Sequence, residues 1–125
     1  MIKRTLAAMT VLACAALPLA AQAKAAAGGN EMSITGQVID LNCFTTKGAS
    51  GAGHKECAQA CAKAGVPLAI VGSDGNIYMA VSSKAGDPQN SKLMPFAEEK
   101  VKVTGTHRFA NGMHTIEITS ITAAT

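Results

Sequence analysis

Three cysteines and one histidine are the residues of this sequence whose types and spacing could do chemistry. They are Cys43, His54, Cys57 and Cys61. On a helix that advances about 100° per residue, the last three project from one sector of about 60°. The Cβ atoms of Cys57 and Cys61 would lie roughly 6 Å apart, which suits two ligands of one metal ion better than a relaxed disulfide. A Cys3His set of this kind favours Zn²⁺, with Cu⁺ as the alternative metal.

The same cysteines allow two other interpretations. Cys43 could form a disulfide with Cys57 or Cys61 and leave the third thiol buried as a small apolar group. It could also exchange between the two partners, as in a thiol-disulfide redox protein. The sequence has neither the Cys-x-x-Cys motif of the usual redox modules nor the Cys-x-x-Cys-His motif of covalent haem attachment. His54 and Cys61 are seven residues apart, so His54 could act as a ligand only from a frayed first turn.

Two further histidines form a weaker candidate pair. A two-residue turn at Asn111-Gly112 would place Phe109 opposite His114 and His107 opposite Ile116. Both imidazoles would then lie on the apolar side of the hairpin, roughly 7 Å apart. They could supply a further metal ligand, but hydrogen-bonded histidines at the rim of a barrel are the simpler interpretation.

Five short strands and two helices are expected to position these residues. The strands are predicted at 32–40, 67–71, 76–81, 101–109 and 113–121, and the helices at 54–64 and 90–99. The Gly-rich segment 45–53 is expected to be a loop that lets Cys43, at the end of the first strand, fold over the first helix. This order predicts a mainly β (α+β) fold, a small five-stranded barrel like the oligonucleotide/oligosaccharide-binding fold, with one helix inserted after strand 1 and another between strands 3 and 4. A five-stranded α+β sandwich is the alternative.

The pair Asp74-Gly75 predicts a two-residue turn between the second and third strands. Such a turn pairs Val71 with Tyr78 and Ile70 with Met79. It directs a set of apolar side chains to one face: Leu68, Ile70, Ile77, Met79 and Val81.

The N-terminus is typical of a secretory signal peptide. Residues 1–23 combine two basic residues, an apolar stretch and the small-residue cleavage site Ala21-Gln22-Ala23. Residues 24–31 are expected to be a flexible tail, and 32–125 a single domain. The chain is therefore predicted to be periplasmic, where an odd number of cysteines, three after cleavage, needs an explanation.

Charge and aromatic content exclude some classes of partner. The 125 residues carry a net charge of +3, and removal of residues 1–23 takes away two basic residues and no acidic one. A nearly neutral domain with four aromatic residues lacks the basic surface and stacking platform of a general nucleic-acid binder. Beyond the leader, no apolar run approaches the roughly 20 residues of a membrane-spanning helix.

The spacing resembles that of a group of small exported bacterial proteins whose activity has not been established. The resemblance covers about 90 residues and rests on five segments. The first three are Gly36-Gln-Val-Ile-Asp40-Leu-Asn-Cys43-Phe, Gly53-His54-Lys-Glu-Cys57-Ala-Gln-Ala-Cys61 and Gly65-Val-Pro67-Leu. The segments Asp74-Gly75-Asn-Ile-Tyr78 and Val101-Lys-Val-Thr-Gly105 complete it. The resemblance implies a barrel-like fold and a functional unit of the three cysteines and His54.

Together these features predict a periplasmic metal-binding module rather than an enzyme. The predicted metal ligands are Cys43, His54, Cys57 and Cys61, and the predicted partners are a zinc or copper ion and a periplasmic protein. The alternatives are a thiol-disulfide redox protein and a disulfide-stapled structural or interaction domain.

Overall fold

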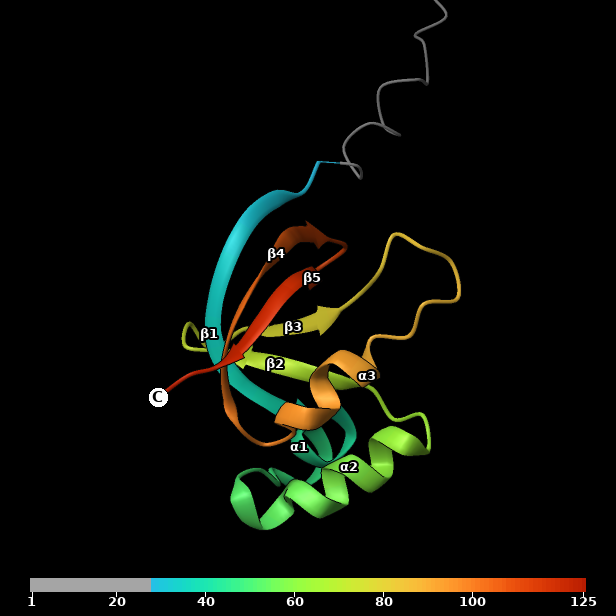
Figure 1. Cartoon of the computed structure of the whole chain (residues 1–125), viewed down its shortest axis with the longest axis vertical. Helices are drawn as coiled ribbons and strands as arrows, with labels where there is room; N and C mark the ends of the chain where they lie inside the picture. The colour runs from blue at the N-terminus through green and yellow to red at the C-terminus, as the bar shows by residue number, and fades with distance from the viewer. Residues whose placement is uncertain (1–27) are drawn as a thin grey trace, which may run out of the picture.

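Alternating apolar residues along five strands close a single sheet into a barrel. The computed structural model describes residues 28–125 (Figure 1). The strands are β1 (Asn30–Asp40), β2 (Leu68–Gly72), β3 (Ile77–Ala80), β4 (Lys100–Ala110) and β5 (Met113–Ala123), in the spatial order β1-β2-β3-β5-β4. Helices follow β1 and lie between β3 and β4, so the predicted barrel is confirmed. The predicted signal peptide lies outside the described residues.

The first strand is long and bent because it pairs with two neighbours. Gly36 faces Gly72 of β2 and also Val101 of β4. A Cβ atom at Gly36 would lie 2.3 Å from the carbonyl oxygen of Val71, so this crossing requires glycine. β1 begins at Asn30, two residues before the strand start expected from the sequence.

The barrel closes where β3 and β5 run parallel. This seam contains only three residue pairs, Tyr78–Ala80 with His114–Ile116. Elsewhere the strands are antiparallel, and β4 and β5 form the longest pairing. The side chains predicted to share the inner face of the last hairpin are buried: Val101, Val103, Ile116 and Ile118.

The predicted register of the β2–β3 hairpin was wrong by one residue. Val71 pairs with Ile77, and Ile70 pairs with Tyr78. The loop has three residues, 73–75, because Gly75 adopts a left-handed conformation at φ 83° and its N–H donates to the carbonyl of Gly72. Tyr78 therefore points into the core at 1% exposure, in the place predicted for Met79.

Asp74 stabilises this turn through its carboxylate. The Tyr78 hydroxyl donates to Oδ2 at 2.6 Å and the Asn76 backbone N–H donates to Oδ1 at 3.0 Å. The Tyr78 hydrogen bond, followed by those from Asn76, lowers the pKa of Asp74 from 3.8 to about 2.

We expect Asp74→Asn to make folding less sensitive to acid. A pKa lowered by folding contributes stability that is present above pH 3.8 and is lost as the pH falls toward 2. The unfolding temperature of the wild type should therefore approach that of the variant as the pH is lowered through this range. A constant difference between the two proteins would contradict this assignment.

The β4–β5 hairpin has the predicted register. Phe109 pairs with His114 and His107 pairs with Ile116 across the turn at Asn111-Gly112. The turn residues have φ values of 53° and 79°, the left-handed pair that a two-residue hairpin turn requires.

The helices differ from the prediction in their bounds. A first helix, α1 (Leu41–Lys47), contains Cys43 and part of the segment expected to be a loop. The predicted helix 54–64 is a 3-10 turn, η2 (Ala52–His54), followed by α2 (Lys55–Lys63). The predicted helix 90–99 is shorter and in two parts, α3 (Asn90–Leu93) and η3 (Met94–Phe96). Within residues 28–125, no helix has the length and apolar character needed to cross a membrane.

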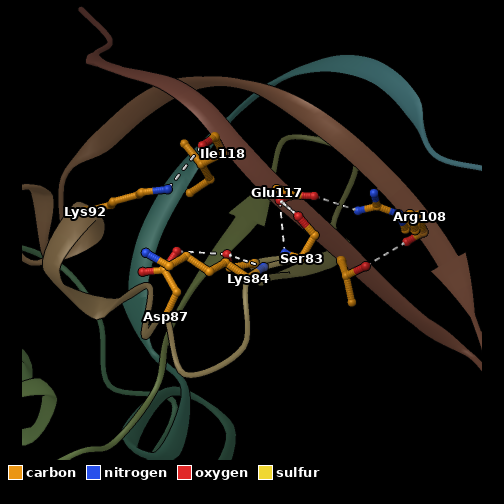
Figure 2. Close-up of polar contacts among 9 residues, drawn as sticks. Ser83, Lys84, Asp87, Lys92, Arg108, Glu117 and Ile118 are labelled. Atoms are coloured by element: carbon orange, nitrogen blue, oxygen red, sulfur yellow. Dashed lines mark hydrogen bonds and ion pairs between the residues drawn. The ribbon is translucent and has the colours of Figure 1, made fainter. Parts of the chain in front are cut away.

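Glu117 helps to attach the long connection between β3 and α3 to the barrel. Figure 2 shows Glu117 of β5 between Ser83 and Arg108. The Ser83 backbone N–H and hydroxyl donate to Oε1 at 3.0 and 2.6 Å, and Arg108 donates to Oε2 at 3.3 Å. The Ser83 hydrogen bonds, more than the contact with Arg108, lower the pKa of Glu117. This loop lies on the side of the barrel where α3 starts (Figure 1).

Candidate metal centre

Helix α1 fixes Cys43 immediately after the first strand. Asp40 is its N-cap, and its Oδ1 accepts the backbone N–H of Cys43 at 2.8 Å. Gly48, at φ 65°, ends the helix and donates to the carbonyls of Cys43 and Phe44. Cys43 is therefore not at a strand end, as predicted, but in the first turn of a short helix, where it is buried.

Helix α2 carries the other two cysteines, with His54 just before it. The Ala58 and Ala62 side chains are buried toward the barrel, so Cys61 is half-buried and Cys57 exposed. His54 belongs to the 3-10 turn and is the N-cap residue of α2. In Figure 1, α1 and α2 lie together beyond the lower end of the barrel.

Two sets of donor atoms meet between these helices. The ligand atoms of Cys43, His54 and Cys57 lie within 4.8 Å of one another. Those of Asp40, Cys43 and Cys61 also lie within 4.8 Å of one another. Ligand sulfurs bound to one zinc ion at about 2.3 Å would be roughly 3.7 Å apart, so small side-chain rotations would bring each set to metal-binding distance. The structure thus brings the four predicted residues into one cluster, in which Cys43 belongs to both sets.

A buried glutamate orients His54. The Glu98 side chain is fully buried, and its Oε1 lies 2.9 Å from His54 Nδ1. Its Oε2 accepts the backbone N–H of Gly51 at 2.7 Å and the Gln37 amide at 3.3 Å. With Nδ1 held in this way, Nε2 is the nitrogen available to a metal ion.

The backbone at Glu98 is strained, since φ is 62° in a residue that is not glycine. Its N–H donates to the carbonyl of Val38 at 3.0 Å, which fastens it to β1. Strain held by the surrounding structure is typical of functional positions. Sequence reasoning missed Glu98 because an acidic residue between Ala97 and Glu99 gives no sign of burial.

Two of the three thiols, those of Cys43 and Cys61, have raised pKa values. The neighbouring Asp40 carboxylate, followed by burial, raises the pKa of Cys61 from 9.0 to about 12. Burial, followed by the charge of Asp40, raises the pKa of Cys43. A metal ion would therefore have to displace thiol protons in order to bind.

The far end of α2 is fastened to the barrel by Asn90 of α3. Its side-chain NH₂ donates to the carbonyls of Ala62 and Val66 at 3.2 and 2.8 Å. Its Oδ1 accepts the backbone N–H of Leu68 at 3.0 Å. Gln59 adds a hydrogen bond to the Met94 carbonyl at 3.2 Å, so α2 has a fixed position relative to the sheet.

His107 and His114 lie far from the cysteines. Nε2 of His107 is 3.0 Å from Nδ1 of His114, and the ring centroids are 5.2 Å apart. His107 pairs with Asn30, at the opposite end of β1 from Asp40. The two imidazoles form a hydrogen bond with each other and pack against Tyr78. Neither belongs to the donor sets of the cysteine cluster.

Comparison of the chain with protein-family models, with curated proteins and with solved structures gave no match. The resemblance to small exported bacterial proteins therefore remains a prediction. The clustering of Cys43, His54, Cys57 and Cys61 on a five-stranded barrel is what that resemblance implied, and the structure has it. Such a cluster is compatible with metal binding.

Proposed function

We propose that this protein is a periplasmic metal-binding module that uses Cys43, His54, Cys57 and Cys61 as ligands. One observation carries the proposal: His54 Nδ1 is held by the buried Glu98, while the same side chain belongs to a donor set with Cys43 and Cys57. A carboxylate on the second nitrogen of a ligand histidine is the usual support of a metal site. The periplasmic location rests on the leader-like residues 1–23.

The donor types favour zinc, with Cu⁺ as the alternative, because thiolates and imidazole are ligands that both ions accept. Cys57 is exposed, whereas Cys43 is buried. An exposed ligand would let a periplasmic protein partner reach the ion. This favours a module that accepts and delivers metal over a closed structural site.

A thiol-disulfide function is the second candidate, since Cys43 lies close to both other thiols. The raised pKa values of Cys43 and Cys61 argue against it, because the attacking group in disulfide exchange is a thiolate.

Native mass spectrometry of protein purified anaerobically from the periplasm, without added metal or chelator, tests the proposed function. We expect bound zinc or copper with all three thiols reduced. Cys57→Ser should lower the metal content and the thermal stability. Glu56→Gln, which changes the exposed neighbour of Cys57 on the same helix, should change neither. A metal-free protein lighter by two hydrogen atoms would contradict metal binding and indicate a disulfide.

A further inference from the structure

The four predicted ligands do not form one set. His54 shares a set with Cys43 and Cys57, and Cys61 shares a different one with Cys43 and Asp40. A single ion bound by Cys43, His54 and Cys57 would therefore leave Cys61 beside a carboxylate instead of beside the ion. The second set has three donors, of which only Cys43 is shared with the first, and it needs neither His54 nor Cys57.

Asp40 is the donor that the sequence did not single out. It is 0% exposed, and its Oδ1 is occupied by the Cys43 N–H. Within the described residues, its Oδ2 makes no well-formed hydrogen bond, and the Cys61 thiol beside it is a weak donor. A poorly satisfied buried carboxylate oxygen is costly, and a nearby cation would remove that cost.

The charges of the cluster also favour the binding of two ions. Three thiolates and one carboxylate carry four negative charges when fully deprotonated. Two divalent ions would neutralise them, whereas one ion bound through Cys43 and Cys57 would leave the buried Asp40 carboxylate without a counter-charge of its own. A mixed thiolate and carboxylate donor set also suits a borderline divalent ion such as Zn²⁺ better than Cu⁺, which prefers sulfur.

We propose that this cluster binds two divalent ions that share the Cys43 thiolate. The outer ion is bound by Cys43, His54 and Cys57, and the inner ion by Asp40, Cys43 and Cys61. Loading both positions releases the three thiol protons to solvent. This inference rests on the proposed function, because it assigns a second ion to the same cysteines.

The test is a Zn²⁺ titration of the reduced protein followed by native mass spectrometry. The wild type should hold two ions at saturation, and Asp40→Asn should hold one. Asparagine keeps an oxygen that can cap α1, so the helix should persist. Asp74→Asn, which removes a carboxylate outside the cluster, should still hold two ions.

A second variant covers the case in which Asp40→Asn fails to fold. Cys61→Ser should also hold one ion, and a Co²⁺ titration of the wild type should show thiolate absorption growing through a second equivalent. Saturation of the wild type at one ion, or two ions retained by a folded Asp40→Asn, would overturn this inference and leave the proposed function in place. A wild type that binds no ion would overturn both.

Discussion

Cys43→Ser is expected to abolish metal binding by the cluster, because Cys43 is the donor common to both sets. Cys57→Ser and Cys61→Ser each remove a donor from only one set, so each should retain part of the metal. Serine is nearly isosteric with cysteine, and its hydroxyl is a poor ligand at neutral pH. The comparison therefore separates the loss of a ligand from the loss of packing.

The change in stability should follow the loss of metal. At a free zinc concentration 100 times Kd, binding at one site stabilises the folded state by about 2.7 kcal/mol. Thermal unfolding with zinc and with a chelator should differ for the wild type and coincide for Cys43→Ser. Zinc-dependent stabilisation that survives in Cys43→Ser would mean that the ion binds elsewhere on the chain.

Glu98→Gln is expected to weaken zinc binding by a factor of about 10 to 100, the usual effect of losing the group that supports a ligand histidine. Glu98 accepts hydrogen bonds from Gly51 and Gln37 as well as contacting His54. The variant should also lose stability without metal, because hydrogen bonds to a buried charge contribute about 1.5–3 kcal/mol.

The adjacent residue provides the control for this variant. Glu99 is partly exposed and forms an ion pair with Lys55 of α2. Exposed ion pairs contribute little, so Glu99→Gln should change zinc affinity by less than about twofold. Competition titration with a chromophoric chelator measures both affinities, and ¹⁵N spectra of His54 report the nitrogen that carries the proton. Equal zinc affinities for the two variants would show that Glu98 does not support the metal ligands.

The strand pattern of this barrel could be predicted because it depends on side-chain alternation. Every second side chain of the last hairpin was expected to be buried, and this holds for Val101, Val103, Ile116 and Ile118. The turn at Asn111-Gly112 fixed the register of this hairpin. At Asp74-Gly75 the same rule failed. The chain there uses a three-residue loop, and Asp74 gains the Tyr78 hydrogen bond that a two-residue turn would not offer.

The site could be predicted only in part. The spacing of His54, Cys57 and Cys61 indicated one helix face, but the 3-10 turn displaces His54 from the helix that carries the two cysteines. Helix α1 could have been found from its N-cap Asp40 and from Gly48, which are ordinary start and stop signals. Glu98 could not have been found in this way, because its burial depends on the pairing of β1 with β4 and not on a local sequence pattern.

Every proposed ligand comes from one continuous segment, residues 40–61. The barrel, in contrast, needs pairs as distant as Asn30 and His107. Contacts that are close in sequence form faster than distant ones, and metal binding can itself drive folding. The proposed ligands could therefore gather around an ion before the barrel closes. Glu98, which is placed only when the later part of the chain packs against β1, would then fix the orientation of His54.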